Sequence, residues 1–460
     1  LWKPHLREKE ESFSYSLSQT AYPGLNKIEL ALEIDNPRLW WPRPLGEPFM
    51  YNFFLNVKEG ESLLDTFSLP LGLREVNLLQ EPLPEDEGTS FTIQINGVKV
   101  FCKGADWVPA DSIIARVDKR KYKRLISMAE EANFNMLRVW GGGVYEDPYF
   151  YEMCARYGIM VWQDFMFACA YYPDDPEFLK EVEKEIETTL KRLRNYTSIV
   201  LWCGNNELQW LHKRNLEKDP TLKFIDYPIY HEIIPRLCAQ LDPSRPYWYS
   251  SPYGGDNPCS EFEGNRHAWG ISIGVEGERE EERVDYRRYR KDRGKFITEF
   301  GILSCIDKKS LEEFFPRDEL YIDSPTWKFH NNTFERGNIK NMLKKYYKDP
   351  ESLSLDDYLT YSMLIQAEAL KYALCHWRRR KFFTSGSLFW MYTDSWGATG
   401  SWTIVDYYLR RKPSFYYVKR AFAPVAISFK EVEGGLSIYG VNDTLRNFTG
   451  YLQWGLSTFK

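Results

Sequence analysis

Two glutamates in this sequence each follow a short apolar run that is typical of a β-strand. Glu207 ends the run SIVLWCGNNE, and Glu299 lies in KFITEFG. Two carboxyl groups about 5–5.5 Å apart perform retaining glycoside hydrolysis: one attacks the anomeric carbon, and the other protonates the departing oxygen and then deprotonates water. The ionised nucleophile would raise the pKa of its partner and keep it protonated. The alternative interpretation is structural: each glutamate caps a strand or pairs with a nearby base.

The elements that must position these side chains are short strands that alternate with amphipathic helices. From Phe91 onward, eight apolar runs, most of them followed by helical patterns, predict an α/β fold, a (β/α)8 TIM barrel. The runs are VKVFCKGADW, FNMLRVW, IMVWQDF, SIVLWCGNNE, PYWYSSPYGG, HAWG, KFITEFG and SLFWMYTD. Aspartates at Asp118, Asp147 and Asp174 are the predicted helix caps.

Three segments are predicted as domains. Residues 1–90 alternate apolar and polar residues between Pro, Gly and Asn clusters, which predicts an immunoglobulin-like β-sandwich before the barrel. Residues 91–421 predict the catalytic barrel, with 301–354, where we find no clear strand, as an elaborated loop over its mouth. Residues 422–460 turn to β patterns again and predict the first strands of a further, truncated C-terminal β-sandwich domain.

Polar and aromatic residues end several of the predicted barrel strands. The active site of such a barrel lies at the carboxyl ends of its strands. Besides the two glutamates, the strand ends carry Arg138, Trp140, Gln163, Asp164, Asn205, Asn206, His267, Trp269, Trp390, Tyr392 and Asp394. The high aromatic content of 16% is compatible with a large aromatic core or with a site that stacks sugar rings.

Composition excludes several classes of function. The net charge of -5 comes from acids and bases mixed along 460 residues, so there is no basic stripe and we expect no nucleic-acid partner. No apolar run approaches the roughly 18 residues of a membrane span, so we expect no membrane partner. The eight cysteines form no C-x-x-C pair, and HExxH is absent, so we expect no metal and no cofactor. Cysteines inside apolar runs favour a reduced, cytoplasmic compartment. The oligomeric state and the compartment stay open.

Several motifs resemble, in order, the barrel signatures of glycoside hydrolase family 2. They are VFCKGADWVPADSI, NMLRVWGGGVYE, IMVWQDFMFACA, SIVLWCGNNE, FITEFG and LFWMYTDSW, and NPRLWWPRPLGEPFMY resembles the family's immunoglobulin-like domain. GNNE and the GGG after LRVW are similar to the β-mannosidase branch. The resemblance implies a retaining exo-acting β-glycosidase that removes terminal β-D-mannosyl residues from a small oligosaccharide or glycoside. The alternatives are an exo-β-D-glucosaminidase or another family 2 exo-glycosidase and, from a different class, an inactive carbohydrate-binding fragment.

The resemblance also implies roles for individual residues. Glu207 matches the acid/base and Glu299 the nucleophile, with Thr298 where the family more often has Ser. Asn206 matches the residue that hydrogen-bonds the sugar 2-hydroxyl, and Arg138 matches a residue that keeps the nucleophile ionised. The positions that wall the glycone subsite are matched by Trp140, Trp269 and Trp390. Further matches that are equally compatible with a rim or core position are Asp106, Trp107, Asp164, Trp210 and His267.

The family normally begins with a jelly-roll domain, and we expect no counterpart of it within these 460 residues. In the β-mannosidase branch that domain supplies an acidic residue to the glycone pocket. We therefore expect a fragment that contains a sandwich, a barrel and the start of a third domain.

Overall fold

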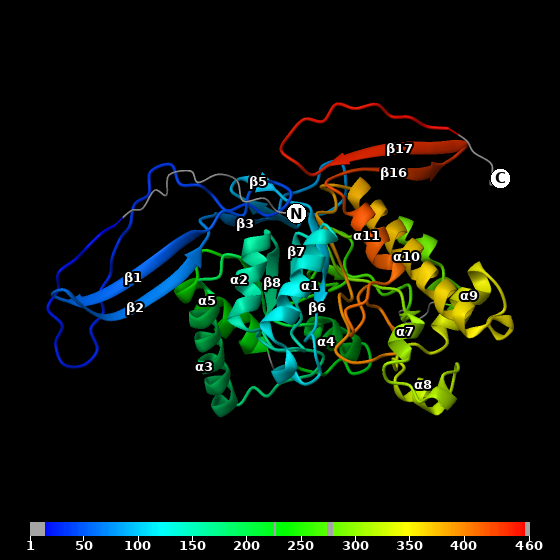
Figure 1. Ribbon diagram of the computed structural model, residues 1–460, viewed down its shortest axis with the longest axis horizontal. Helices are drawn as coiled ribbons and strands as arrows, with labels where there is room; N and C mark the ends of the chain where they lie inside the picture. Colours follow the sequence, from blue (N-terminus) through cyan, green and yellow to red (C-terminus); the bar gives the residue numbers. More distant parts are fainter. Residues whose placement is uncertain (1–13, 225–226, 274–278, 456–460) are drawn as a thin grey trace. The chain divides into compact units, whose positions relative to one another are not determined.

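The computed structural model describes residues 14–224, 227–273 and 279–455 (Figure 1). The chain divides into two compact units, Leu1–Arg38 and Leu39–Lys460. The described part of the first unit has neither helix nor strand, and Tyr15 donates a hydrogen bond across it to the carbonyl of Glu33. The elements described below all belong to the second unit.

An eight-stranded parallel sheet is the centre of the second unit. Its strands are β6 (Cys102–Trp107), β7 (Met136–Val139), β8 (Met160–Asp164), β9 (Ile199–Cys203), β10 (Tyr247–Trp248), β11 (Arg266–His267), β12 (Ile297–Glu299) and β14 (Gly386–Phe389). The hydrogen-bonded order is β10-β9-β8-β7-β6-β14-β12-β11, so the first and last strands along the chain are neighbours and the sheet curls round. Each of the eight predicted runs overlaps one of these strands, and the predicted TIM barrel is confirmed.

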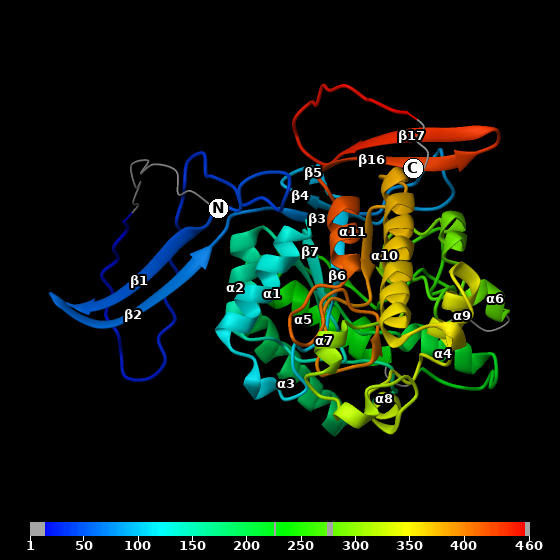
Figure 2. The same ribbon diagram turned by 45° about the vertical axis from the view of Figure 1, so that its right-hand side comes forward.

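Helices pack around this sheet (Figure 2). They are α1 (Lys119–Glu131), α2 (Pro148–Tyr157), α3 (Pro176–Leu193), α4 (Leu208–Leu216), α5 (Ile234–Leu241), α6 (Glu280–Arg283), α7 (Lys308–Leu311), α8 (Pro325–Phe329), α9 (Asn338–Tyr346), α10 (Leu355–Arg379) and α11 (Pro413–Ala421). None of the helices within the described ranges is long and apolar enough to cross a bilayer.

The helix starts show how the sequence sets these boundaries. Asp118 caps α1 and Asp147 caps α2, each by accepting a hydrogen bond from a backbone N–H of the first turn, as predicted. The predicted cap Asp174 is wrong by one residue, because Asp175 is the N-cap of α3. Pro176 follows at the first helical position, where its missing N–H loses nothing, and this places the cap directly before it.

The remaining strands form small antiparallel sheets. These are the hairpin β1 (Tyr51–Glu59) and β2 (Ser62–Leu71); the sheet β3 (Val76–Leu79), β4 (Thr92–Ile95) and β5 (Val98–Lys99); the pair β13 (Ser304–Cys305) and β15 (Gly400–Ser401); and the hairpin β16 (Val425–Val432) and β17 (Gly435–Asn442). The β3-β4-β5 sheet spans the predicted boundary after residue 90, and the domain limits stay predictions. The segment 301–354, where no clear strand was expected, contains β13 and helices α7 to α9. A two-residue strand is too short to leave an alternating pattern.

The base of the barrel is filled by aromatic side chains. Phe91, just before β4, packs its ring edge-on against Trp248 and Phe296, with ring centroids 4.8 and 5.6 Å apart. Met160 and Leu388 join the same buried cluster. A TIM barrel is a packed core and not a pore, so polar groups gather at the strand ends.

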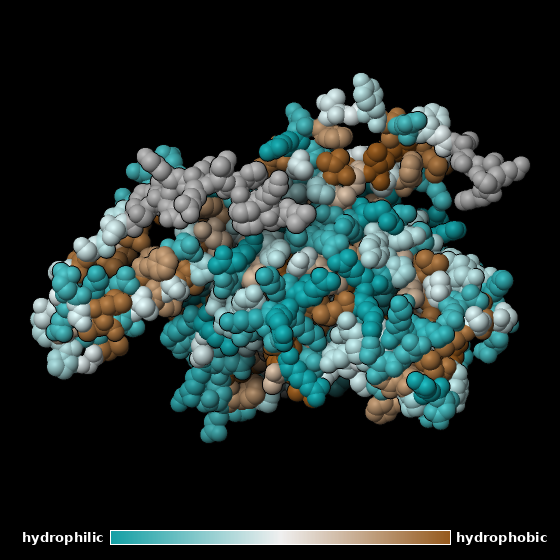
Figure 3. Space-filling model, in the orientation of Figure 1, coloured by the Kyte–Doolittle hydropathy of each residue, from teal (hydrophilic) through white to brown (hydrophobic). Residues whose placement is uncertain are grey.

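The C-terminal hairpin differs from the barrel in its surface. Ile427, Phe429 and Leu436 are 54%, 58% and 63% exposed, and brown side chains lie over β16 and β17 in Figure 3. A two-stranded hairpin is only marginally stable by itself. Asp443, which follows β17, anchors it to the barrel through ion pairs with Lys103 and Arg378 at 2.8 Å each.

Candidate active site

Glu207 lies beyond the end of β9 in an unusual backbone conformation. Its φ is +68°, a left-handed value that costs a residue with a side chain about 1 kcal/mol or more. Asn206 bridges on both sides to Ala168 and Ser251, and the N–H of Glu207 donates to the carbonyl of Ser251 at 2.8 Å. The neighbouring loops thus hold a strained residue at the strand end, with its side chain 23% exposed.

Glu299 is the last residue of β12, and its side chain is only 5% exposed. Arg138, on β7, donates to Glu299 Oε1 at 2.8 Å. The indole N–H of Trp269 donates to Glu299 Oε2 at 3.0 Å. Both oxygens of this carboxyl group therefore have a donor, one of which is a permanent cation.

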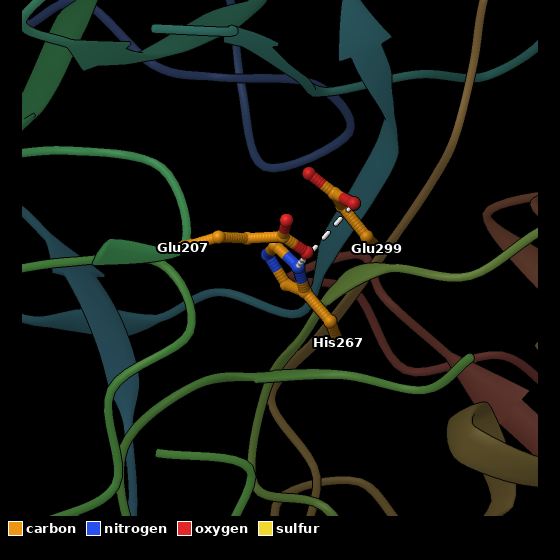
Figure 4. Close-up of side chains that lie close together, drawn as sticks. All are labelled: Glu207, His267 and Glu299. Carbon is orange, nitrogen blue, oxygen red and sulfur yellow. Dashed lines mark hydrogen bonds and ion pairs between the residues drawn. The ribbon is translucent and has the colours of Figure 1, made fainter. Parts of the chain in front are cut away.

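The two carboxyl groups converge on one imidazole (Figure 4). Nδ1 of His267 is 2.9 Å from Glu207 Oε1 and 3.3 Å from Glu299 Oε2. One oxygen of each glutamate and one nitrogen of His267 all lie within 4.8 Å of one another. This spacing fits the about 5–5.5 Å of a retaining pair and is too short for the about 6.5–9.5 Å of an inverting pair.

Arg138 connects Glu299 to a buried polar network. Its guanidinium, fully buried, also donates to Asp106 Oδ1 at 3.0 Å, Asp164 Oδ2 at 2.8 Å and Asn206 Oδ1 at 2.7 Å. Asp164 in turn accepts the backbone N–H of Gly141 at 3.0 Å. A Cβ at Gly141 would lie 2.7 Å from the carbonyl oxygen of Phe165, so glycine is needed for this close approach.

Three carboxyl groups share the one guanidinium of Arg138, and this imbalance shapes their protonation. Burial raises the pKa of Asp106 well above its usual range, with Glu299 and Asp164 adding to the rise and Arg138 opposing it. Asp106 Oδ2 is buried and has no hydrogen-bond partner. A neutral Asp106 would leave the network with one less uncompensated charge.

The environments of Glu207 and Glu299 separate their proton affinities. Burial raises the pKa of Glu207, against which only a thiol hydrogen bond and the more distant Arg138 act. Burial and the nearby Glu207 also raise the pKa of Glu299, but the directly bonded Arg138 opposes that rise. Because the guanidinium contacts Glu299 and not Glu207, Glu299 gives up its proton first when the pair titrates.

The polar groups around Glu207 are His267 and Cys169. Burial lowers the pKa of His267 to about 3, so its imidazole is neutral at ordinary pH. Its Nε2 lies 3.1 Å from the hydroxyl oxygen of Ser251. On the other side, the thiol of Cys169 donates to Glu207 Oε2 at 3.5 Å. Burial raises the pKa of this thiol to about 12, so that it remains a donor.

The amide of Asn206 has a defined orientation. Its Oδ1 accepts from Arg138, and its Nδ2 donates to the sulfur of Cys169 at 3.3 Å. The Nδ2 group therefore lies on the side of Glu207, where it is a donor for a ligand hydroxyl.

Aromatic residues at other strand ends lie near this cluster. Trp140 and Trp390 meet edge to face with ring centroids 5.1 Å apart, and Trp140 Nε1 is buried without a partner. Trp269 packs edge to face against Trp402 at 5.7 Å. A Cβ at Gly301 would lie 2.3 Å from the carbonyl oxygen of Trp390 and 3.4 Å from the Trp269 ring. Both tryptophans therefore lie close to Gly301.

Two of the predicted site residues have other partners. Trp107 is buried, stacks on Tyr122 and donates its indole N–H to Glu146 at 2.8 Å. Trp210, on α4, packs under the guanidinium of Arg214. Neither residue forms a hydrogen bond or ring contact with Glu207 or Glu299 among the described residues, so their place in the site stays a prediction.

The sequence reasoning missed Cys169 and Ser251. Both lie within or next to runs that were recognised as strand ends, Cys169 in IMVWQDFMFACA and Ser251 in PYWYSSPYGG. Position at a strand end was therefore an available signal, but neither side chain is a usual acid, base or ligand. Their importance comes from contacts with Glu207 and His267.

The cluster of Glu207, His267 and Glu299 is also where a metal ion would find three ligand atoms within the described parts of the chain. The partners of these atoms favour another interpretation. Glu299 is already bonded to Arg138 and Trp269, and a cation placed between them would face the guanidinium.

Comparison with known families identifies the family to which this fold belongs. Two family models match: glycosyl hydrolases family 2 over residues 4–74, and the TIM barrel domain of the same family over residues 91–263. Together they match more than half of the chain. The chain belongs to glycosyl hydrolases family 2.

Individual family 2 proteins resemble much of this chain. Beta-mannosidase B of Thermothelomyces thermophilus is 36% identical over 418 residues, which are 86% of this chain and 48% of that protein. Beta-mannosidase B of Emericella nidulans is 35% identical, over 88% of this chain and 48% of that protein. The chain spans about half the length of the curated relatives it matches.

Solved structures of related enzymes also resemble this chain. The beta-D-mannosidase of Dictyoglomus thermophilum has a TM-score of 0.82 and 43% identity, over 90% of this chain and 49% of that chain. The exo-chitosanase CsxA of Amycolatopsis orientalis has a TM-score of 0.63 at 16% identity, over 88% of this chain and 46% of that chain, which shows the fold alone.

Proposed function

We propose that this chain is the catalytic core of a retaining exo-β-mannosidase that removes terminal β-D-mannosyl residues from small oligosaccharides or glycosides. The observation that carries the proposal is the convergence of Glu207 and Glu299 within 4.8 Å, with the cation Arg138 bonded to only one of them. Two carboxyl groups at this spacing and with unequal proton affinities are the requirement for double displacement.

In the first step, the ionised Glu299 attacks the anomeric carbon of the terminal sugar. A bond forms between that carbon and a Glu299 oxygen, while the bond to the aglycone oxygen breaks. Glu207 gives its proton to the departing oxygen. Arg138 and the Trp269 indole keep Glu299 ionised and oriented before the attack.

In the second step, water hydrolyses the glycosyl-enzyme. Glu207, now a carboxylate, takes a proton from the water. At the same time the water oxygen bonds to the anomeric carbon, and the bond between that carbon and the Glu299 oxygen breaks. Both glutamates return to their starting protonation states, and the configuration at the anomeric carbon is retained. His267 contacts both carboxyl groups. In this scheme it acts through those contacts and forms no bond to the sugar.

The mannosyl preference rests on similarity to the relatives that are named beta-mannosidases, at 36% and 43% identity. Within the site, Asn206 presents Nδ2 next to Glu207, where the 2-hydroxyl of the sugar would lie. Trp140, Trp390 and Trp269 would wall the subsite, Asp164 would hold Arg138 in place, and His267 would orient the acid. Trp107 and Trp210 would lie farther from the reacting atoms.

A panel of nitrophenyl glycosides tests the proposal. We expect hydrolysis of the β-mannoside to exceed hydrolysis of the β-glucosaminide and β-glucoside, with a β-configured first product. A preference for the glucosaminide would favour an exo-β-D-glucosaminidase and leave the mechanism standing. If this chain is inactive and a longer natural chain that contains it is active, the 460 residues are a carbohydrate-binding core that needs further parts.

A further inference from the structure

A chain of side-chain hydrogen bonds leads from a buried amide to the imidazole between the two glutamates. Asn265 Nδ2 donates to the carbonyl of Ser250 at 3.1 Å, and this bond fixes which end of the amide is which. With the amide turned over, Asn265 Oδ1 would face the carbonyl oxygen of Ser250, and neither oxygen could donate. Asn265 Oδ1 therefore faces Thr298 and can only accept, at 2.9 Å.

Each hydroxyl group in this series of hydrogen bonds has one proton to donate. Thr298 directs its proton to Asn265 Oδ1 or, at 3.3 Å, to the carbonyl of Arg266, and both of these groups are acceptors. The Thr298 oxygen must then accept the proton of Ser251, 2.8 Å away. Ser251 has used its only proton, so its oxygen accepts a hydrogen bond from the fourth member of the series, His267 Nε2, at 3.1 Å.

We infer that Asn265, Thr298 and Ser251 form a proton-directing relay that places the hydrogen of neutral His267 on Nε2, so that Nδ1 accepts the proton of Glu207. Nδ1 lies 2.9 Å from Glu207 Oε1, and an unprotonated nitrogen there attracts a carboxylic acid and repels a carboxylate. The inference rests on the proposed function, because it explains how the acid of that site keeps its proton in the resting state.

The other groups that face Glu207 act in different directions. Arg138, from β7, favours the ionised carboxylate, and so does the Cys169 thiol, which donates to Oε2. Glu299, from β12, repels a second negative charge. His267, from β11, is the group whose influence depends on its tautomer: Nδ1–H would stabilise the carboxylate, whereas bare Nδ1 stabilises the acid.

Ser251, Thr298 and Asn265 are thus positioning residues, which act through His267 and do not touch the sugar. The relay needs a hydroxyl at residue 298 and no particular carbon skeleton. Thr298 meets this requirement, and a serine at residue 298 would meet it equally.

The tautomer can be measured without any turnover. In the protein labelled with ¹⁵N-histidine, a ring nitrogen that bears hydrogen and one that does not have widely separated shifts. We expect His267, assigned by its loss in His267→Gln, to show a bare Nδ1 and a protonated Nε2 near neutral pH. A protonated Nδ1 in the neutral ring would overturn the inference, whether or not the protein hydrolyses glycosides.

The pH profile of kcat/KM tests the consequence. Ser251→Ala and Thr298→Val free His267 to carry its hydrogen on Nδ1, which lowers the pKa of Glu207. The basic limb should then move to lower pH by roughly one unit. Thr298→Ser keeps the hydroxyl and should leave the limb in place.

Ser250→Ala is the matched control. Ser250 is equally buried and adjacent, but its hydroxyl donates to Asn205 and not to His267. It should leave the basic limb unmoved even if stability falls. Equal shifts in Ser250→Ala and Ser251→Ala, or none in Ser251→Ala and Thr298→Val, would contradict the relay. If no β-glycoside is hydrolysed, the proposed function fails and the ¹⁵N spectrum alone decides the inference.

Discussion

Glu207 and Glu299 are the same residue type at the ends of two strands that are not adjacent, β9 and β12, and their surroundings are opposite in kind. Glu299 is 5% exposed, with a guanidinium on one oxygen and an indole N–H on the other. Glu207 is 23% exposed and has a thiol and a neutral imidazole, but no bonded cation. The difference teaches that neighbours, and not side-chain identity, divide two glutamates into one that ionises early and one that retains its proton.

Removal of the ionised carboxyl group should have the largest effect. Glu299→Gln keeps the shape of the side chain and removes the group that forms the glycosyl-enzyme bond. We expect kcat/KM for a nitrophenyl β-mannoside to fall by about 10⁴-fold or more. A residual rate within tenfold of the parent would show that the two glutamates have been assigned the wrong roles.

Removal of the protonated group should give a smaller loss that depends on the leaving group. Glu207→Ala should slow natural mannosides by roughly 10²–10⁴-fold, and activated aryl mannosides far less in the first step. The parent should lose activity as pH rises through the elevated pKa of Glu207, because the acid must be protonated. Glu207→Ala should lack this basic limb. Equal losses on both substrate classes would contradict an acid at this position.

The cation on the Glu299 side should matter for stability as well as for activity. Arg138→Met leaves Asp106, Asp164 and Glu299 buried without their shared partner, so we expect the free energy of unfolding to fall by about 3–5 kcal/mol. Denaturant unfolding measures this change. Asp106→Asn is the matched control: because burial raises the pKa of Asp106, an amide mimics its neutral acid and the change should stay within about 1 kcal/mol.

The amide beside Glu207 should contribute to selectivity. Asn206→Ala removes the Nδ2 donor and leaves a polar ligand group unpaired, which costs about 1–3 kcal/mol. The rate with β-mannosides should fall about 10- to 100-fold. The ratio of the mannoside rate to the glucoside rate should therefore decrease. An unchanged ratio would place C2 recognition elsewhere.

The smallest expected effect concerns the thiol on Glu207. Cys169→Ala removes a donor to the carboxylate, so the pKa of Glu207 should rise and the basic limb of kcat/KM should move up by a few tenths of a pH unit. This is opposite in sign to Ser251→Ala. Cys375→Ala, a half-buried cysteine on α10, is the control and should not move the limb.

Much of this architecture was predictable because it depends on local patterns. Apolar runs of strand length that alternate with capped amphipathic helices predicted all eight barrel strands, and polar residues at their ends predicted Glu207, Glu299, Arg138 and His267. Errors arose where the pattern was short or ambiguous. Asp174 and Asp175 are adjacent aspartates before one proline, and β13 is two residues long.

The sequence by itself determined which residue types stand at the carboxyl ends of parallel strands, because burial and periodicity are encoded along the chain. Only the tertiary structure decided which atoms meet. Arg138 and Glu299 meet although β6 and β14 lie between β7 and β12 in the sheet, because the sheet curls round. The order Asn265, Thr298, Ser251, His267 joins residues from separate segments, and its direction depends on single protons. No local pattern records such directions, since each follows from the acceptor that lies next to it in space.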